Sequence, residues 1–104
     1  MSDLSQQEWA SNLDSDPKSI ILDVRTDSEV EEGMIPKAIH LDIHQGQAFI
    51  SALEKLDKTN TYFVYCRSGA RSGQACSILK QMGYEAYNLL GGFNDWDGDT
   101  VIPE

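Results

Sequence analysis

The residues best suited to chemistry in this chain surround Cys66. An apolar run, FVY at 63–65, stops at this cysteine, and a glycine-containing loop with two arginines leads from it into an amphipathic stretch. If that stretch is a helix, its first N–H groups and the positive end of its dipole favour a thiolate over a thiol. Arg67 and Arg71 add positive charge nearby. The pattern predicts an exposed cysteine with a lowered pKa that acts as a nucleophile.

The loop after the cysteine is suited to binding an anion. Its backbone N–H groups can turn inward as a nest, and Gly69 permits the tight curvature that this requires. The two arginines would either hold an anionic ligand or only lower the pKa of the cysteine. The two serines are expected to shape the loop and cap the helix after it. The predicted ligand-binding residues are Arg67, Ser68, Gly69, Ala70, Arg71 and Ser72.

The charge of the chain is strongly negative and unevenly distributed. A net charge of −9 argues against nucleic acid and membranes as partners, because both require a basic surface. All the acidic residues lie outside 59–84, whereas that window holds Arg67, Arg71 and Lys80. Such a segment would draw a small anion toward the cysteine. The alternative is that the window reflects chance together with a buried strand.

Other residues that could do chemistry point to structural roles. If a helix begins near Ala70, Cys76 lies about 9 Å along its axis, beyond the reach of an unstrained disulfide with Cys66. Cys76 also falls beside an apolar stripe, so we expect a small core residue. His40 and His44 fall on a strand end and the loop after it, which does not suit a metal site. No metal and no bound cofactor are predicted.

A second cluster of charged residues follows the pattern DVRxxxE at 23–29. Carboxylates near a reactive cysteine invite an acid–base role for Asp23, Arg25 and Glu29. We expect structural roles instead, because Arg25 and Glu29 are ionic partners at short spacing. A nucleophile that is already a thiolate also needs no base to remove its proton.

Strands and helices alternate along the chain. The hydrophobic patterns and turn residues predict helices over 6–13, 27–32, 46–57 and 70–82, and strands over 19–24, 38–43, 61–66 and 85–90. Residues Gly91, Gly92, Phe93 and Trp96 are expected to pack a C-terminal helix on the sheet. The alternation predicts a three-layer α/β fold, in which a parallel sheet has helices on both faces and ligands bind at the carboxyl ends of the strands.

The length of 104 residues and the 40% hydrophobic content fit one domain spanning 1–104. The first ten residues lack a basic region followed by an apolar stretch, and no segment approaches the roughly 20 apolar residues that span a bilayer. A cytoplasmic protein is the expectation.

Four separated pieces of the sequence resemble the single-domain rhodaneses, which are sulfurtransferases. They are LDVRTDSEVEEGMIPKAIHL at 22–41, FVYCRSGARS at 63–72, the following helix with its GY, and LLGGFNDW at 89–96. The chain departs from the family at Val30, Met34 and Lys37, in a structural turn. The resemblance implies a sheet of about five parallel strands, the first near 2–4.

The resemblance also implies a reaction. In rhodaneses the cysteine corresponding to Cys66 takes a sulfane sulfur from a donor such as thiosulfate, forms a persulfide, and passes the sulfur to cyanide or a thiol. The alternatives are a persulfide carrier that receives sulfur from a relay protein and a catalytically inert scaffold. Phosphatases and arsenate reductases of similar fold carry five residues between cysteine and arginine, whereas four separate Cys66 from Arg71.

Overall fold

The computed structural model describes residues 2–103, and within that range five strands form one parallel sheet. The sheet order is β1-β5-β4-β2-β3. The strands are β1 (Asp3–Leu4), β2 (Ser19–Asp23), β3 (Ile39–His40), β4 (Thr61–Tyr65) and β5 (Glu85–Leu89). Every residue of β4 is buried, which explains why its sequence is continuously apolar and aromatic. The predicted α/β class and the short first strand are both confirmed.

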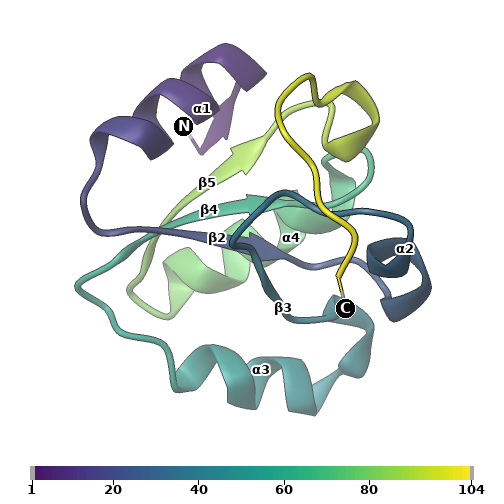
Figure 1. Ribbon diagram of the computed structural model, residues 1–104. Helices are drawn as coiled ribbons and strands as arrows, with labels where there is room; N and C mark the ends of the chain where they lie inside the picture. Colours follow the sequence, from purple (N-terminus) through teal and green to yellow (C-terminus); the bar gives the residue numbers. More distant parts are fainter. Residues whose placement is uncertain (1, 104) are drawn as a thin grey trace.

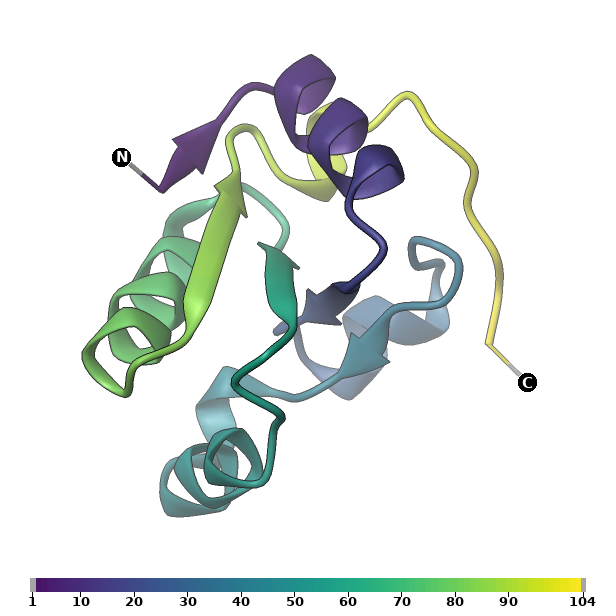
Figure 2. The same cartoon turned by 90° about the vertical axis from the view of Figure 1, so that its left-hand side faces the viewer.

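Helices cover both faces of this sheet (Figures 1 and 2). The α-helices in the described range are α1 (Gln6–Ser15), α2 (Asp27–Glu31), α3 (Gln47–Glu54) and α4 (Ala70–Gln81), and the short 3-10 helices are η1 (Ile43–Gln45) and η2 (Phe93–Asp95). The arrowheads of β2, β4 and β5 point toward the side of the molecule where α2 lies (Figure 1). The carboxyl ends of the central strands therefore face α2.

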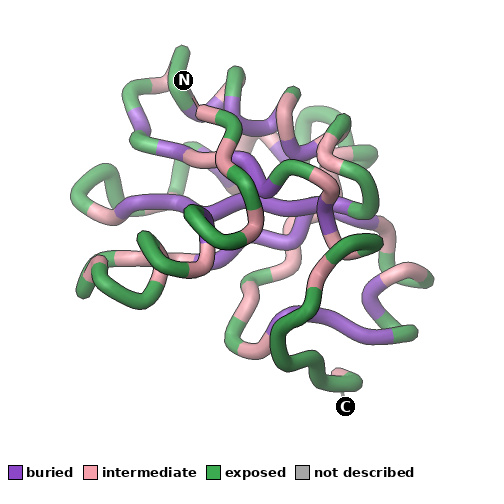
Figure 3. The backbone as a smooth tube through the Cα atoms, turned by 90° about the horizontal axis from the view of Figure 1, so that it is seen from above, coloured by how far each residue is buried: buried purple, intermediate pink, exposed green. Residues whose placement is uncertain are grey.

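The buried side chains form two clusters, one on each face of the sheet. Alternation along β4 places Tyr62 and Val64 in the cluster with α3 and α4, and Phe63 and Tyr65 in the cluster with α1. Trp9 of α1 makes edge-to-face contacts with both Phe63 and Tyr65. Buried backbone accordingly runs through the centre of the molecule, with exposed segments around it (Figure 3). β4 is thus held rigidly from both sides.

Two helices begin with complete capping boxes. In α1 the pair is Ser5 and Glu8, and in α2 it is Thr26 and Glu29. In each box the hydroxyl accepts from the glutamate N–H and the glutamate side chain accepts from the N–H of the capping residue. This local chemistry explains why both helix starts could be predicted.

Three predicted elements differ from the structure. The strand expected over 38–43 ends at His40, because Asp42 accepts a hydrogen bond from the N–H of His44 at 2.8 Å and starts η1. The helix expected over 46–57 is shorter, since α3 covers 47–54. The C-terminal helix is wrong: in the described residues only η2 follows β5, and the chain beyond it pairs Val101 with Met34 in an antiparallel bridge.

No helix within residues 2–103 is long and apolar enough to span a bilayer.

Candidate active site

Cys66 lies at the carboxyl end of β4, between that strand and α4. Asp23, at the end of β2, pairs with Tyr65 in the parallel ladder, so the ends of the two central strands meet beside the cysteine. Helix α4 begins at Ala70 after a left-handed Gly69, whose φ is 104°. The resulting loop is short and strongly curved, as the sequence suggests.

The Cys66 sulfur accepts hydrogen bonds from the start of α4. The N–H of Gly69 donates to Sγ at 3.1 Å, and Ser72 Oγ lies 3.3 Å from Sγ. Burial by itself would raise the pKa of the Cys66 thiol. The Ser72 hydroxyl and the backbone N–H groups of Ser72, Gly69 and Ser68 outweigh burial, so the pKa lies below its ordinary value.

The expected exposure of Cys66 is wrong. The residue has 0% exposed surface and directly follows β4, whose residues are all buried.

Arg71 is held by a carboxylate from α2. Its Nη1 and Nη2 donate to Glu29 Oε1 and Oε2 at 2.7 and 2.9 Å. Hydrogen bonding from Arg71 lowers the pKa of Glu29 to about 2. The pKa of Arg71 is raised, mainly by Glu29, with a smaller electrostatic contribution from Cys66. Arg71 is therefore fixed by its ion pair with Glu29, and its positive charge also interacts electrostatically with Cys66.

The expected ion pair between Arg25 and Glu29 is wrong. Arg25 instead forms a bidentate pair with Asp23, with Nη2 to Oδ2 at 2.7 Å, and donates to the carbonyl of Gly33. The Tyr65 hydroxyl donates to the same carboxylate at 2.5 Å. Asp23 and Arg25 are two positions apart at the end of β2, so their side chains meet. The Glu29 side chain is directed to Arg71 of α4 instead. Asp23 and Arg25 are buried and satisfy each other's hydrogen bonding, and the structural role expected for them stays a prediction.

The segment after β5 fixes the start of the loop. The N–H of Phe93 donates to the carbonyl of Cys66 at 2.9 Å, and the N–H of Asn94 donates to that of Arg67 at 3.0 Å. A Cβ on Gly92 would lie 2.5 Å from the Arg67 carbonyl oxygen, so only glycine allows this approach. The sequence reasoning missed this role, although the double glycine after a strand signals a close backbone contact.

Comparisons with known proteins agree with this architecture. Residues 6–99 match the family model described as rhodanese-like domain. The chain belongs to the rhodanese-like family. Its relatives include YtwF of Bacillus subtilis, provisionally named a sulfurtransferase, which is 38% identical over 94% of this chain and 92% of its own length. Thiosulfate sulfurtransferase GlpE of Coxiella burnetii is 37% identical over 74% of this chain and 70% of its own.

A solved structure supports the fold as well. The rhodanese-like domain protein from Staphylococcus aureus superposes with a TM-score of 0.85 at 28% identity, covering 100% of both chains. The predicted family is confirmed, and these names together support sulfur transfer as the general activity of this rhodanese-like chain.

The serines of this rhodanese-like loop differ from expectation in one respect. Gly69 is the N-cap of α4, and no side chain caps the helix. Ser72 instead is fully buried and faces Cys66 and Asn88. Ser68 and Ala70 are exposed on the loop. The sequence placed Ser72 in the loop but gave no sign of its contact with β5.

Arg67 is the exposed arginine of the rhodanese-like loop. Its nearest polar contact is a hydrogen bond from Nε to Asn94 Oδ1 at 3.4 Å. Beside it lies a cavity of about 210 Å³ lined by Arg25, Glu29, Glu32, Arg67, Phe93 and Asn94. Arg67 thus has donors available for a ligand, in contrast to Arg71.

Cys76 lies in the core beneath α4. Burial raises the pKa of its thiol to about 12, which makes it unreactive at neutral pH. Both cysteines are free. The prediction of a small core residue is confirmed.

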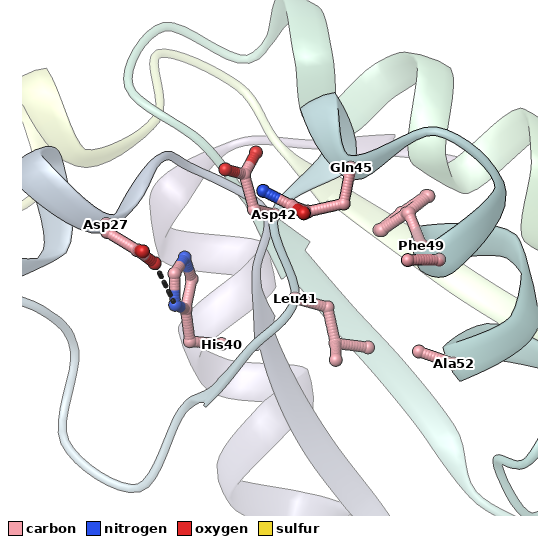
Figure 4. Close-up of a pocket in the computed structure, with 8 residues that line it drawn as sticks. Asp27, His40, Leu41, Asp42, Gln45, Phe49 and Ala52 are labelled. Carbon is pink, nitrogen blue, oxygen red and sulfur yellow. Dashed lines mark ion pairs between the residues drawn. The ribbon is translucent and has the colours of Figure 1, made fainter.

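A second cavity lies beside β3 and α3, and Figure 4 shows the residues around it. His40 Nε2 lies 2.6 Å from the carbonyl oxygen of Arg25, and His40 Nδ1 lies 3.6 Å from Asp27. Because a carbonyl only accepts, Nε2 carries a proton and is occupied by the backbone. Within residues 2–103 no group of three His, Cys, Asp or Glu side chains could hold a metal ion.

Proposed function

We propose that this rhodanese-like protein transfers a sulfane sulfur from thiosulfate, or a donor of the same kind, to cyanide or a thiol. The observation that carries the proposal is the position of Cys66, whose sulfur receives the Gly69 N–H at 3.1 Å at the start of α4. A lowered pKa provides the thiolate, which is a soft and strong nucleophile toward sulfur. The similarity to a thiosulfate sulfurtransferase supports the choice of donor.

In the first step the Cys66 thiolate attacks the outer sulfur of thiosulfate. A new S–S bond forms, the bond to the central sulfur breaks, and sulfite leaves with that electron pair. The loop N–H groups stabilise the negative charge that now lies on the outer sulfur of the persulfide. No proton has to be removed, which agrees with the structural roles of Asp23 and Arg25.

In the second step an acceptor attacks the outer sulfur. Cyanide forms a bond to that sulfur and becomes thiocyanate, while the electron pair of the S–S bond returns to Cys66 as a thiolate. A thiolate acceptor becomes a persulfide in the same way. The protein ends each cycle unchanged and needs no bound cofactor.

The size of the loop favours sulfur over phosphoryl chemistry. Four residues separate Cys66 from Arg71, and Arg71 is directed to Glu29. A phosphatase of this type would require a wider loop and an arginine free to bind phosphoryl oxygens. We therefore place the charge recognition of the donor on Arg67 and the backbone N–H groups.

Thiocyanate formation from thiosulfate and cyanide tests the proposal. We expect wild-type protein to turn over, Cys66→Ser to be inactive, and the matched control Cys76→Ser to retain turnover after correction for its folded fraction. Full activity of Cys66→Ser would contradict the assignment of the nucleophile. Absence of wild-type turnover, with sulfur accepted from a protein persulfide, would identify a carrier instead.

A further inference from the structure

Asn88 connects the active-site loop to β1, the edge strand beside β5. It lies on β5, is 2% exposed, and is 16 residues from Ser72 and 19 residues from Gly69 in sequence. Its Nδ2 donates to the carbonyl oxygen of Gly69 at 3.1 Å and to Asp3 Oδ1 at 3.0 Å. Both amide hydrogens are therefore used, and the orientation of the amide is fixed because a flip would set Oδ1 against two oxygens, of Asp3 and Gly69, that can only accept.

The fixed orientation of the Asn88 amide directs its oxygen, Oδ1, to the hydroxyl of Ser72. Asn88 Oδ1 lies 2.5 Å from Ser72 Oγ, and a carbonyl oxygen only accepts. The hydroxyl proton of Ser72 therefore points to Asn88 in this arrangement. Cys66 Sγ lies 3.3 Å from the same hydroxyl oxygen, so a protonated Cys66 can donate to Ser72 while Ser72 donates to Asn88.

A thiolate reverses this order. It has no proton to donate, and the Ser72 hydroxyl adds to the stabilisation by the backbone N–H groups only if its proton turns from Asn88 to Sγ. Asn88 Oδ1 then loses its donor inside a fully buried cluster, which costs free energy. The Ser72 hydroxyl proton thus has two possible acceptors. It binds Asn88 Oδ1 when Cys66 is a thiol and Cys66 Sγ when Cys66 is a thiolate.

We propose that Asn88 is a positioning residue for Cys66: its carbonyl oxygen competes with the Cys66 sulfur for the single hydroxyl proton of Ser72. The inference rests on the proposed function in taking Cys66 as the reacting group. Formation of a persulfide moves the negative charge to the outer sulfur, so the Ser72 proton returns to Asn88. The Ser72–Asn88 pair therefore stabilises the thiol and the persulfide more than the free thiolate.

Other charged and titratable groups lie around Cys66. Arg71 and Cys76 on α4 interact with it electrostatically. Glu29 on α2 binds Arg71, and Asp3 on β1 accepts a hydrogen bond from Asn88. None of them is altered in the variants below, apart from Cys76, which is replaced throughout. Asn88→Ala also removes the hydrogen bond to Asp3, and it does so equally in both Ser72 backgrounds.

The test is the pH profile of Cys66 alkylation by iodoacetamide in a Cys76→Ala background. The midpoint is compared because burial slows alkylation in all variants alike. We expect Ser72→Ala to move the midpoint to higher pH and to slow alkylation below the midpoint about tenfold, since a hydrogen bond to the thiolate is lost. Tyr84→Phe, which removes buried hydrogen bonds to α3, serves as a matched control and leaves the midpoint unchanged.

Asn88→Ala removes the competitor. The shift that Asn88→Ala causes in the alkylation midpoint is measured twice, once with Ser72 present and once in Ser72→Ala. We expect the midpoint with Ser72 present to move further toward low pH than the midpoint in Ser72→Ala. Loss of the Gly69 anchor acts equally in both backgrounds and cancels in this cycle. Equal effects of Asn88→Ala in the two backgrounds would overturn the proposal. Asn88→Leu, of similar shape, replaces Asn88→Ala if the latter does not fold.

The wild-type chain offers a second readout. The NMR signals of the Asn88 side-chain amide should shift with the titration of Cys66 and lose that shift in Ser72→Ala. Amide signals that do not follow Cys66 would also overturn the proposal. Neither measurement uses thiosulfate, so a failure of sulfur transfer and a failure of this inference are seen separately.

Discussion

Arg71 and Glu29, 42 residues apart in sequence, form a bidentate ion pair with N–O distances of 2.7 and 2.9 Å. The pair joins α4 to α2 across the carboxyl ends of the strands. It also explains why the loop arginine lies against the protein, while the neighbouring Arg67 is exposed. The ion pair therefore holds Arg71 in place, whereas the guanidinium of Arg67 lies outside it.

Replacing Glu29 by Gln should make the free energy of unfolding less dependent on pH in the acid range. Arg71 lowers the pKa of Glu29 from 4.5 to about 2. A carboxylate with a depressed pKa contributes stability above its unfolded pKa and loses it as the pH falls through the folded value. Glu29→Gln should cost about 1 to 2 kcal/mol at pH 7 and show less change in unfolding free energy than wild type between pH 4.5 and 2.

Chemical denaturation at several pH values measures this effect. Gln retains the capping box with Thr26, so only the ion pair is removed. Glu8→Gln, in the capping box of α1, is the matched control because the structure shows no arginine bonded to Glu8. Parallel pH dependences for Glu29→Gln and wild type would refute the stabilising role of the pair.

Arg67→Ala should weaken donor binding. Arg67 is exposed on the loop, and the hydrogen bond from its Nε to Asn94 Oδ1 is long, at 3.4 Å. Loss of a charge-assisted contact to an anionic donor predicts a rise of about three- to tenfold in the KM for thiosulfate, with kcat nearly unchanged. Lys80→Ala, which removes an exposed cation at the other end of α4, should leave KM unaltered. An unchanged KM in Arg67→Ala would leave recognition to the backbone alone.

Gly92→Ala should displace the loop. The new Cβ would lie 2.5 Å from the Arg67 carbonyl oxygen and 2.7 Å from that of Cys66. We expect a loss of about 2 to 4 kcal/mol in stability and a larger loss of sulfur transfer, because backbone atoms cannot move aside without moving the site. Gly46→Ala separates strain from contact: its φ of 57° is similar to the 59° of Gly92, yet nothing lies within 4 Å. Equal effects of the two substitutions would show that strain alone matters.

The parts of the fold that sequence could predict are those encoded locally. The run into Cys66, the left-handed Gly69 and the start of α4 lie within a few residues of one another, and each helix start with a capping box is specified by neighbouring side chains. Pairings across long separations could not be predicted. From the sequence, Arg25 is the arginine nearest to Glu29, whereas in the fold Glu29 on α2 pairs with Arg71 on α4.

The same limit applies to the site. Asn88 and Gly92 lie on or after β5, and their contacts with the loop depend on the order of strands in the sheet. The burial of Cys66 likewise depends on how the loop closes over the strand end. Motif spacing predicts which cysteine reacts, whereas the tertiary fold determines the hydrogen-bond partners and the burial of that cysteine.

The most direct measurement of the central claim is the mass of the reduced protein after incubation with thiosulfate, followed by peptide mapping. We expect a gain of one sulfur atom on the peptide that contains Cys66, its loss on addition of cyanide, and no gain in Cys66→Ser. No added sulfur on the wild-type protein, or sulfur found on Cys76 instead, would contradict a Cys66 persulfide.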